Sequence, residues 1–186
     1  GVVAEDFDGD GGLDLFVAQN FFATNPEYSR CDAGRGLVML GDGRGGFRPM
    51  PSSESGIAIY GEQRACAVSD YNQDGRIDLA VGQNNAPTKL MLNATGKAGL
   101  RVRLKGRGQN PATIGATVTL RIPGGPAITR EVQSGSGYWG VNSPVLVLPG
   151  PDGQRELAVA WPSGVEVVFC AAGLTRCDSD SGDAST

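Results

Sequence analysis

Short runs of alternating apolar and polar residues, separated by turns rich in glycine and proline, fill most of this chain. Such alternation over about four to eight residues is typical of strands that bury one face. No long segment has the spacing of an amphipathic helix, so the pattern predicts an all-β fold. In the first half the strand-like runs are Gly1–Ala4, Leu13–Ala18 (with Leu13, Leu15 and Val17 on one face), Leu37–Leu40, Ile57–Ile59, Ala65–Val68, Ile77–Val81 and Lys89–Asn93.

The second half alternates more strictly. Six amphipathic strands separated by such turns predict a small antiparallel β-sandwich or barrel. The change of character at Ala94–Gly99, a short linker, predicts domains at 1–95 and 96–172 and a polar, loose tail at 173–186. The six runs are Leu100–Lys105, Ala116–Ile122, Ile128–Val132, Val145–Leu148, Leu157–Trp161 and Val165–Phe169.

Two acidic loops, Asp6–Asp14 and Asp70–Asp78, have the pattern Asp-x-[Asp/Asn]-x-Asp-Gly-x-x-Asp and begin 64 residues apart. Side chains at positions 1, 3, 5 and 9 and the carbonyl at position 7 would surround one ion, with a glycine turn at position 6. Oxygen-only ligands in a flexible loop favour Ca²⁺ over Mg²⁺. The predicted ligands are Asp6, Asp8, Asp10, Gly12 and Asp14 in the first loop, and Asp70, Asn72, Asp74, Arg76 and Asp78 in the second.

The setting of these loops is not that of an EF-hand. An EF-hand needs a glutamate at position 12 and flanking helices, whereas that position is Val17 or Val81 within a predicted strand. The alternative is a pair of solvated acidic turns without an ion, but the repetition in matching context favours two Ca²⁺ sites. A repeat of this length made of short strands is typical of propeller blades.

The composition excludes several kinds of chemistry. The chain has no histidine, which removes Ser-His-Asp triads, Cys-His dyads and His-based zinc sites. Its four cysteines contain no Cys-x-x-Cys pair, and an even number in a calcium-dependent β protein favours disulfides. The preferred pairs are Cys31–Cys66 and Cys170–Cys177, and the alternative is four buried thiols.

Charge and glycine spacing argue against nucleic-acid and nucleotide binding. Residues 1–95 carry a net charge of −6, concentrated in the acidic loops, and residues 96–176 one of +5, spread along alternating strands as on a solvated sheet face. The spacing G-x-G-x-x-G at Gly41, Gly43 and Gly46 precedes Phe47–Pro51, which does not form the helix that a phosphate site requires. We therefore expect a hairpin there. No apolar run is long enough to span a membrane.

These features resemble known families. The two acidic loops, the strands that leave them and the turn Gly41–Phe47 resemble the FG-GAP/VCBS repeats of integrin-type β-propellers. The second half resembles the ASPIC/UnbV domain that follows such repeats in cartilage acidic protein-like bacterial proteins. Its signs are Leu100–Gly106, Ile114–Ala116, Gln133–Tyr138 and Trp161–Gly164. Propeller rings need about four to eight blades, and residues 1–93 hold roughly one and a half. We expect further blades upstream or pairing of open strand edges between copies.

Three functions follow as hypotheses. The resemblance implies a secreted or cell-surface recognition module with structural Ca²⁺, which binds a protein or glycan and for which Tyr138 and Trp139 are the candidate ligand contacts. The second hypothesis is a subunit that assembles into an oligomer or extracellular filament through open blade edges. The third, ranked last, is a carboxylate-based enzyme or biosynthetic accessory. Its available acids are Glu131, Glu156 and Glu166, for which a solvated strand face is the simpler explanation.

Overall fold

The computed structural model describes residues 1–23, 25–29, 33–106, 108–150, 155–164, 166–171 and 175–176. Within these residues the chain forms fourteen strands and one short helix, α1 (Ser52–Ser55), so the predicted all-β class is confirmed. All the strand pairs are antiparallel, and the described strands close no barrel. No helix in this part of the chain is long and apolar enough to cross a membrane.

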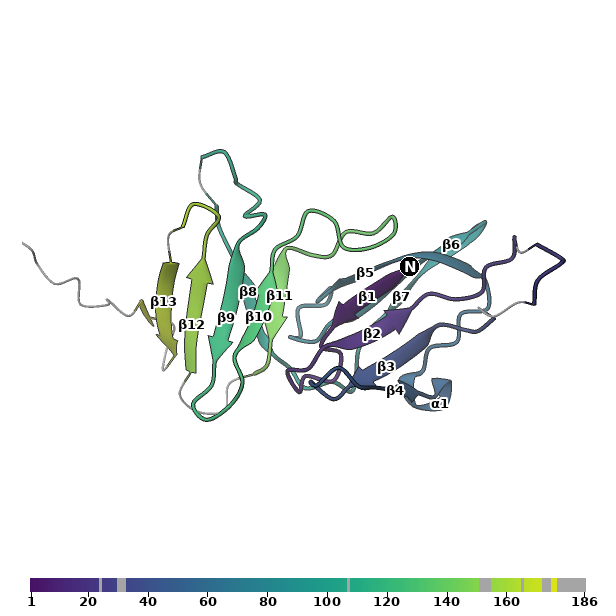
Figure 1. Cartoon of the computed structure of the whole chain (residues 1–186), viewed down its shortest axis with the longest axis horizontal. Coiled ribbons are helices and arrows are strands. Elements are labelled where there is room, and N and C mark those ends of the chain that lie inside the picture. The colour runs from purple at the N-terminus through teal and green to yellow at the C-terminus, as the bar shows by residue number, and fades with distance from the viewer. Residues whose placement is uncertain are drawn as a thin grey trace, which may run out of the picture. The chain divides into compact units, whose positions relative to one another are not determined.

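The first four strands form one blade, a sheet in which neighbours in sequence are neighbours in space (Figure 1). A transverse row of apolar side chains joins them, since Val3 lies opposite Phe16, Phe16 opposite Val38, and Val38 opposite Met50. Phe16 is fully buried, whereas Leu13 is 42% exposed, so the core-facing side of the second strand is the one opposite to Leu13, Leu15 and Val17. The strands are β1 (Val2–Glu5), β2 (Asp14–Val17), β3 (Leu37–Gly41) and β4 (Phe47–Met50).

The second blade repeats this arrangement with three strands in the order β5 (Glu62–Ser69), β6 (Asp78–Asn84) and β7 (Ala86–Met91). Val68 lies opposite Leu79 and Leu79 opposite Met91, which reproduces the apolar row of the first blade. Ile57 and Ile59 are buried in the same core but are not in a strand, because among the described residues that segment pairs with no strand.

The chain divides into two compact units that do not follow the halves of the sequence. The first contains both blades and comprises Gly1–Arg103 and Gln133–Gly150; it also includes β8 (Leu100–Arg103) paired with β11 (Val145–Leu148). The second comprises Leu104–Val132 and Pro151–Thr186. The predicted domain boundaries stay predictions, and the compact units divide the chain at other positions.

The second unit contains one five-stranded sheet in the order β10-β9-β12-β13-β14. Its buried residues include Val118, Leu120 and Val159, on strands whose alternation predicted this face. Of the six predicted strands, two pair with each other as β8 and β11, and four enter this sheet. The sheet strands are β9 (Thr117–Arg121), β10 (Ile128–Glu131), β12 (Arg155–Ala160), β13 (Glu166–Ala171) and β14 (Thr175–Arg176).

A loop of the first unit covers the edge of β5. The Asn142 side-chain oxygen accepts a hydrogen bond from the Val68 amide at 3.1 Å, and the Ser143 amide donates to the Val68 carbonyl at 2.9 Å. Gly140 packs so closely that a Cβ there would lie 2.2 Å from the Cys66 carbonyl oxygen. The edge of β5 is therefore occupied by the chain itself at this point.

Candidate metal centre

The first acidic loop is wrapped around the side chain of Asp6. Its carboxylate accepts hydrogen bonds from the amides of Gly9 at 2.8 Å, Asp10 at 3.1 Å and Gly11 at 2.9 Å. Gly9 and Gly11 have φ angles of 77° and 98°, a left-handed backbone that glycine adopts without steric cost. These glycines let the loop curl until its amides converge on one carboxylate.

Asp14 anchors the other end of the loop to the blade. It begins β2 and is almost fully buried, and its carboxylate accepts hydrogen bonds from the amides of Phe7 at 2.8 Å and Gly41 at 2.9 Å. Gly41 is the last residue of β3, so Asp14 joins the loop to two neighbouring strands. Buried backbone donors of this kind need an acceptor, which explains a carboxylate at position 9 independently of any ion.

The oxygens of Asp6, Asp8 and Asp14 converge, with one ligand atom of each within 4.8 Å of the others. Burial raises the pKa of Asp6 from 3.8 to about 6, and burial also raises the pKa of Asp14. The charge of Asp8 contributes to both shifts. Three converging carboxylates, of which Asp6 and Asp14 have raised pKa values, form an oxygen-only donor set that fits a hard divalent cation such as Ca²⁺.

Asp10 is outside this cluster. Its carboxylate instead accepts a hydrogen bond from the Gly12 amide at 2.7 Å. Asp10 and the carbonyl of Gly12 therefore stay predicted ligands, whereas the structure brings together the side chains at positions 1, 3 and 9.

The second acidic loop has the same scaffold. The carboxylate of Asp70 accepts hydrogen bonds from the amides of Asp74 at 3.0 Å and Gly75 at 2.9 Å. Asp78 is almost fully buried and accepts from the amides of Tyr71 and Asn93, both at 2.8 Å. In both loops the carboxylates at positions 1 and 9 therefore accept hydrogen bonds from backbone amides.

The charge partners of the second loop differ from those of the first. The Arg101 Nε lies 2.5 Å from an Asp70 carboxylate oxygen, and an Arg76 guanidinium nitrogen lies 2.9 Å from Asp74. The side-chain amide of Asn72 also donates to the Asp74 carboxylate at 3.0 Å. This hydrogen bond has the largest effect on the pKa of Asp74 and lowers it, and the contacts with Arg76 lower it further. In the described chain no set of three carboxylates converges here. The five predicted ligands of this loop, Asp70, Asn72, Asp74, Asp78 and the Arg76 carbonyl, stay predictions.

Asn93 links the two loops. Its side-chain amide donates to the carbonyl oxygen of Phe7 at 2.7 Å and to that of Ile77 at 3.2 Å, while its backbone amide donates to Asp78. Phe7 belongs to the first loop and Ile77 to the second. Sequence reasoning missed this residue because an asparagine beside a glycine-rich stretch has the composition of a linker.

The predicted linker is in fact packed between the acidic loops. The Lys97 amide donates to the Asp8 carbonyl at 2.9 Å, and the Gly99 amide donates to the Gly75 carbonyl at 2.7 Å. A Cβ at Gly9 would lie 2.6 Å from the Lys97 carbonyl oxygen, so the contact needs a glycine. We call residues 93–99 the bridging segment, since they hydrogen-bond to both loops.

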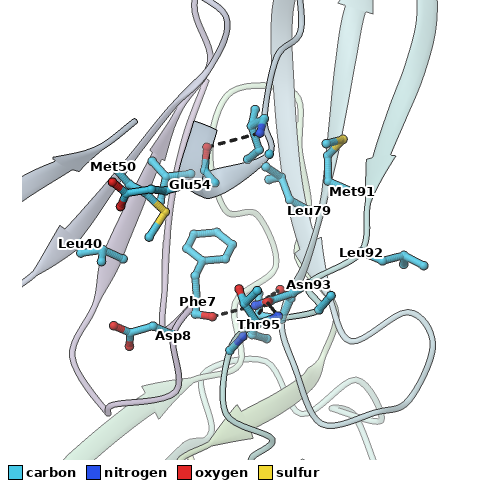
Figure 2. Close-up of a pocket in the computed structure, with 17 residues that line it drawn as sticks. Phe7, Asp8, Leu40, Met50, Glu54, Leu79, Met91, Leu92, Asn93 and Thr95 are labelled. Atoms are coloured by element: carbon cyan, nitrogen blue, oxygen red, sulfur yellow. Dashed lines mark hydrogen bonds between the residues drawn. The ribbon is translucent and has the colours of Figure 1, made fainter. Parts of the chain in front are cut away.

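An apolar groove of about 410 Å³ lies between the two blades, beside the first loop. Figure 2 shows the Phe7 ring directed into it, with Leu40 and Met50 of the first blade on one side and Leu79 and Met91 of the second on the other. The same view shows Asn93 hydrogen-bonded to the Phe7 carbonyl oxygen. A residue of the acidic loop thus contributes its side chain to the space between the blades.

The glycine-rich turn after β3 is the predicted hairpin. Asp42 accepts hydrogen bonds from the amides of Arg44 at 2.7 Å and Gly46 at 2.8 Å, which lower its pKa. The chain continues directly into β4. The amides that a phosphate would need are used by this carboxylate, and no helix follows the turn.

Tyr138 and Trp139, the predicted ligand contacts, are both exposed, Trp139 to 84%. Their ring centroids lie 5.8 Å apart, and Trp139 has a φ of 57°, a backbone conformation rare for a bulky residue. Exposed neighbouring aromatic rings suit stacking against a sugar or a protein surface. Their role in binding stays a prediction.

Cys66 is buried and forms no disulfide with a cysteine that the structure describes, and burial raises the pKa of its thiol. Cys31, Cys177 and the side chain of Cys170 lie outside the described residues, so both predicted disulfides stay predictions.

Among the candidate catalytic acids, Glu131 is exposed on β10 and Glu156 forms an ion pair with Arg121. The side chain of Glu166 lies outside the described part.

Two blades with acidic loops at their corners define a propeller-type β protein, and the comparisons with known proteins agree. The sequence model of the FG-GAP-like repeat matches residues 6–81, and that of the ASPIC and UnbV family matches residues 106–172. The chain therefore contains an FG-GAP-like repeat followed by an ASPIC/UnbV region, as the sequence motifs predicted. Such regions are typical of non-catalytic recognition modules.

The chain is also similar in sequence to a known vertebrate protein. The chain is 29% identical over 170 residues to cartilage acidic protein 1 from Xenopus tropicalis. The match covers 88% of this chain and 25% of the relative, so the chain spans about a quarter of the length of the protein it matches.

Proposed function

We propose that this chain is part of a secreted or cell-surface recognition module in which Ca²⁺ is structural. The observation that carries the proposal is the convergence of the Asp6, Asp8 and Asp14 carboxylates at a blade corner, where burial raises the pKa of Asp6 and of Asp14. The FG-GAP-like match and the resemblance to a cartilage acidic protein support an extracellular setting.

The first loop supplies the groups that would hold the ion. Asp6 and Asp14 are fixed by backbone hydrogen bonds, so their oxygens are positioned before an ion arrives, and Asp8 adds a more exposed carboxylate. A bound Ca²⁺ supplies positive charge that offsets the repulsion within this set. The bridging segment then connects the stiffened first loop to the second.

The recognition surface that we propose is the exposed aromatic pair. Tyr138 and Trp139 stand on the loop whose later residues, Asn142 and Ser143, are hydrogen-bonded to β5. A loop tied to a sheet in this way presents its aromatic side chains at small entropic cost, which suits a protein or glycan partner at a cell surface.

Thermal unfolding tests the calcium proposal. Ca²⁺ should raise the melting temperature of ion-free protein, and chelator should reverse this rise. Asp6→Asn removes one converging carboxylate and should abolish most of the rise, whereas Glu131→Gln, at an exposed position of the second unit, should leave it intact. A melting temperature indifferent to Ca²⁺ in the parent chain would contradict the proposal.

A second candidate function, a subunit that self-assembles, is favoured by the open edge of the second blade. Among the described strands β7 pairs on one side only; Leu90 on β7 and Leu92 just after it are exposed, and Leu92 also lines the groove between the blades. The occupant that we propose is a strand of a second copy, which would extend the three-stranded blade.

Light scattering and negative-stain microscopy test this second candidate. The chain should form concentration-dependent assemblies, and Leu90→Lys should reduce them because a charge on an edge strand disfavours pairing. Lys89→Arg, at the neighbouring exposed position on the same strand, keeps the charge of that strand and is the matched control. A monomer at high concentration would contradict self-assembly and leave the calcium proposal standing.

A further inference from the structure

One carboxylate of the second loop already has a cationic partner. The Asp70 side chain is 0% exposed, and the Arg101 side chain that lies against it is 34% exposed. Its counterpart in the first loop, Asp6, accepts hydrogen bonds from backbone amides and forms no ion pair among the residues that the structure describes. The loops therefore differ in charge balance at position 1, the same place in the motif.

The backbone of Arg101 is held in place from two directions. Arg101 lies in β8, opposite Val147 of β11, and Val147 is buried in the core of the blades. Two residues earlier, the Gly99 amide donates to the Gly75 carbonyl within the second loop itself. A Cβ at Gly99 would lie 2.3 Å from the Leu148 carbonyl oxygen, so this approach is close. The side chain of Arg101 is thus delivered to Asp70 by an anchored strand.

We propose that Arg101 is an internal competitor for the cation of the second acidic loop. The inference rests on the calcium function proposed above. A cation that binds through Asp70 needs an oxygen that the guanidinium holds, and it is repelled by the positive charge that remains nearby. The first loop consequently fills first, and the second loop takes an ion only by displacing Arg101.

This arrangement predicts two opposite effects of one substitution. In Arg101→Gln the buried Asp70 carboxylate loses its charge partner, and an uncompensated buried charge is strongly destabilising, so the ion-free protein should melt at a lower temperature. The same change frees the carboxylate, so the second loop should bind Ca²⁺ more tightly. A residue that merely supports the loop would lower both stability and affinity.

Calorimetric titration of the ion-free chain with Ca²⁺ tests the proposal. The parent should bind one ion tightly and a second at least about tenfold more weakly, and Arg101→Gln should strengthen the second step by about tenfold or more. Arg103→Gln is the matched control, since Arg103 is exposed on the same strand, and it should behave as the parent. Arg101→Lys keeps a cation at the position, so its second step should stay weak.

Three results decide the outcome. An unchanged or weakened second step in Arg101→Gln, in protein shown by circular dichroism to be folded at saturating Ca²⁺, would overturn the role of Arg101 while the first ion stands. Two equally tight steps in the parent would do the same. An absence of binding in the parent and in all the variants would overturn the calcium function itself, and the inference with it.

Discussion

The two acidic loops share a backbone and differ in charge. In each loop the position 1 carboxylate accepts hydrogen bonds from backbone amides of its own loop. The position 9 carboxylate, at the start of one strand, accepts a hydrogen bond from an amide at or just after the end of the next strand. In the first loop three carboxylates face one another, whereas in the second Arg101 and Arg76 each neutralise one.

This difference teaches that the repeated motif carries two separable properties. The hydrogen bonds accepted by Asp14 and Asp78 explain the motif as a turn that fastens a blade corner, with or without an ion. The facing carboxylates of the first loop add a reason for a cation, because backbone amides donate to them but no cationic side chain forms an ion pair with them among the described residues. A sequence match to the motif therefore predicts the hydrogen-bonded turn, and it predicts cation binding only in part.

The largest effect is expected at position 9, where the loops are alike. Asp78→Ala leaves the amides of Tyr71 and Asn93 without their acceptor and should lower the free energy of unfolding by about 3 kcal/mol. Asp14→Ala should cost about as much, as measured by denaturant unfolding of ion-free protein. Asp42→Ala is the control, since it also loses two amide contacts but is exposed, and it should cost much less. A small cost at Asp78 would show that position 9 needs an ion to matter.

Asn93→Ala should have the next largest effect, because it removes the contacts with the Phe7 and Ile77 carbonyls that join the loops. We expect a loss of about 1–2 kcal/mol in the free energy of unfolding. Thr95→Ala, a change in the same segment, is the matched control. Equal stability of the two variants would mean that the loops are not coupled through this side chain.

A pH effect on stability should mark position 1 of the first loop. The pKa of Asp6 is raised to about 6, so between about pH 4 and pH 6 the folded state binds more protons than the unfolded state. The stability contribution of Asp6 in ion-free protein therefore falls as pH rises through that range. Asp6→Asn should remove this slope from the pH profile of the melting temperature. A slope unchanged by Asp6→Asn would contradict the assignment.

The smallest effect is expected in the exposed aromatic pair. Trp139→Ala should change the free energy of unfolding by less than about 0.5 kcal/mol, since the side chain is almost fully exposed. Binding to a glycan array or to cell-surface extracts should nevertheless fall if the pair contacts the partner. A large loss of stability would mean that Trp139 is structural.

Much of the fold could be predicted because alternation reports directly on half-buried strands. The strands that leave the acidic loops and the hairpin at Asp42 were predicted from local residues alone. The alternation in β2 left open which face is buried: Leu15 and Val17 share one face, and the register with β1 and β3 buries the other, which carries Phe16. The alternation of apolar and polar residues shows that a segment is a strand, but it does not show which face of the strand packs against the core.

The candidate site was predictable only where its residues are close in sequence. Asp6, Asp8 and Asp14 fall within one motif, so their spacing showed the cluster. Asn93 and Arg101 lie 15 and 23 residues after Asp78 and act on the loops through a segment with the composition of a linker. Their roles depend on how the chain returns to the blade corner, which no local pattern reports.

The most direct test of the difference between the loops is an experimental structure at a limiting amount of Ca²⁺. We predict an ion among Asp6, Asp8 and Asp14, with the Arg101 guanidinium still paired to Asp70. Two results would contradict the proposed difference between the loops. One is an ion in the second loop while the first holds none. The other is equal ion occupancy in both loops with Arg101 still paired to Asp70.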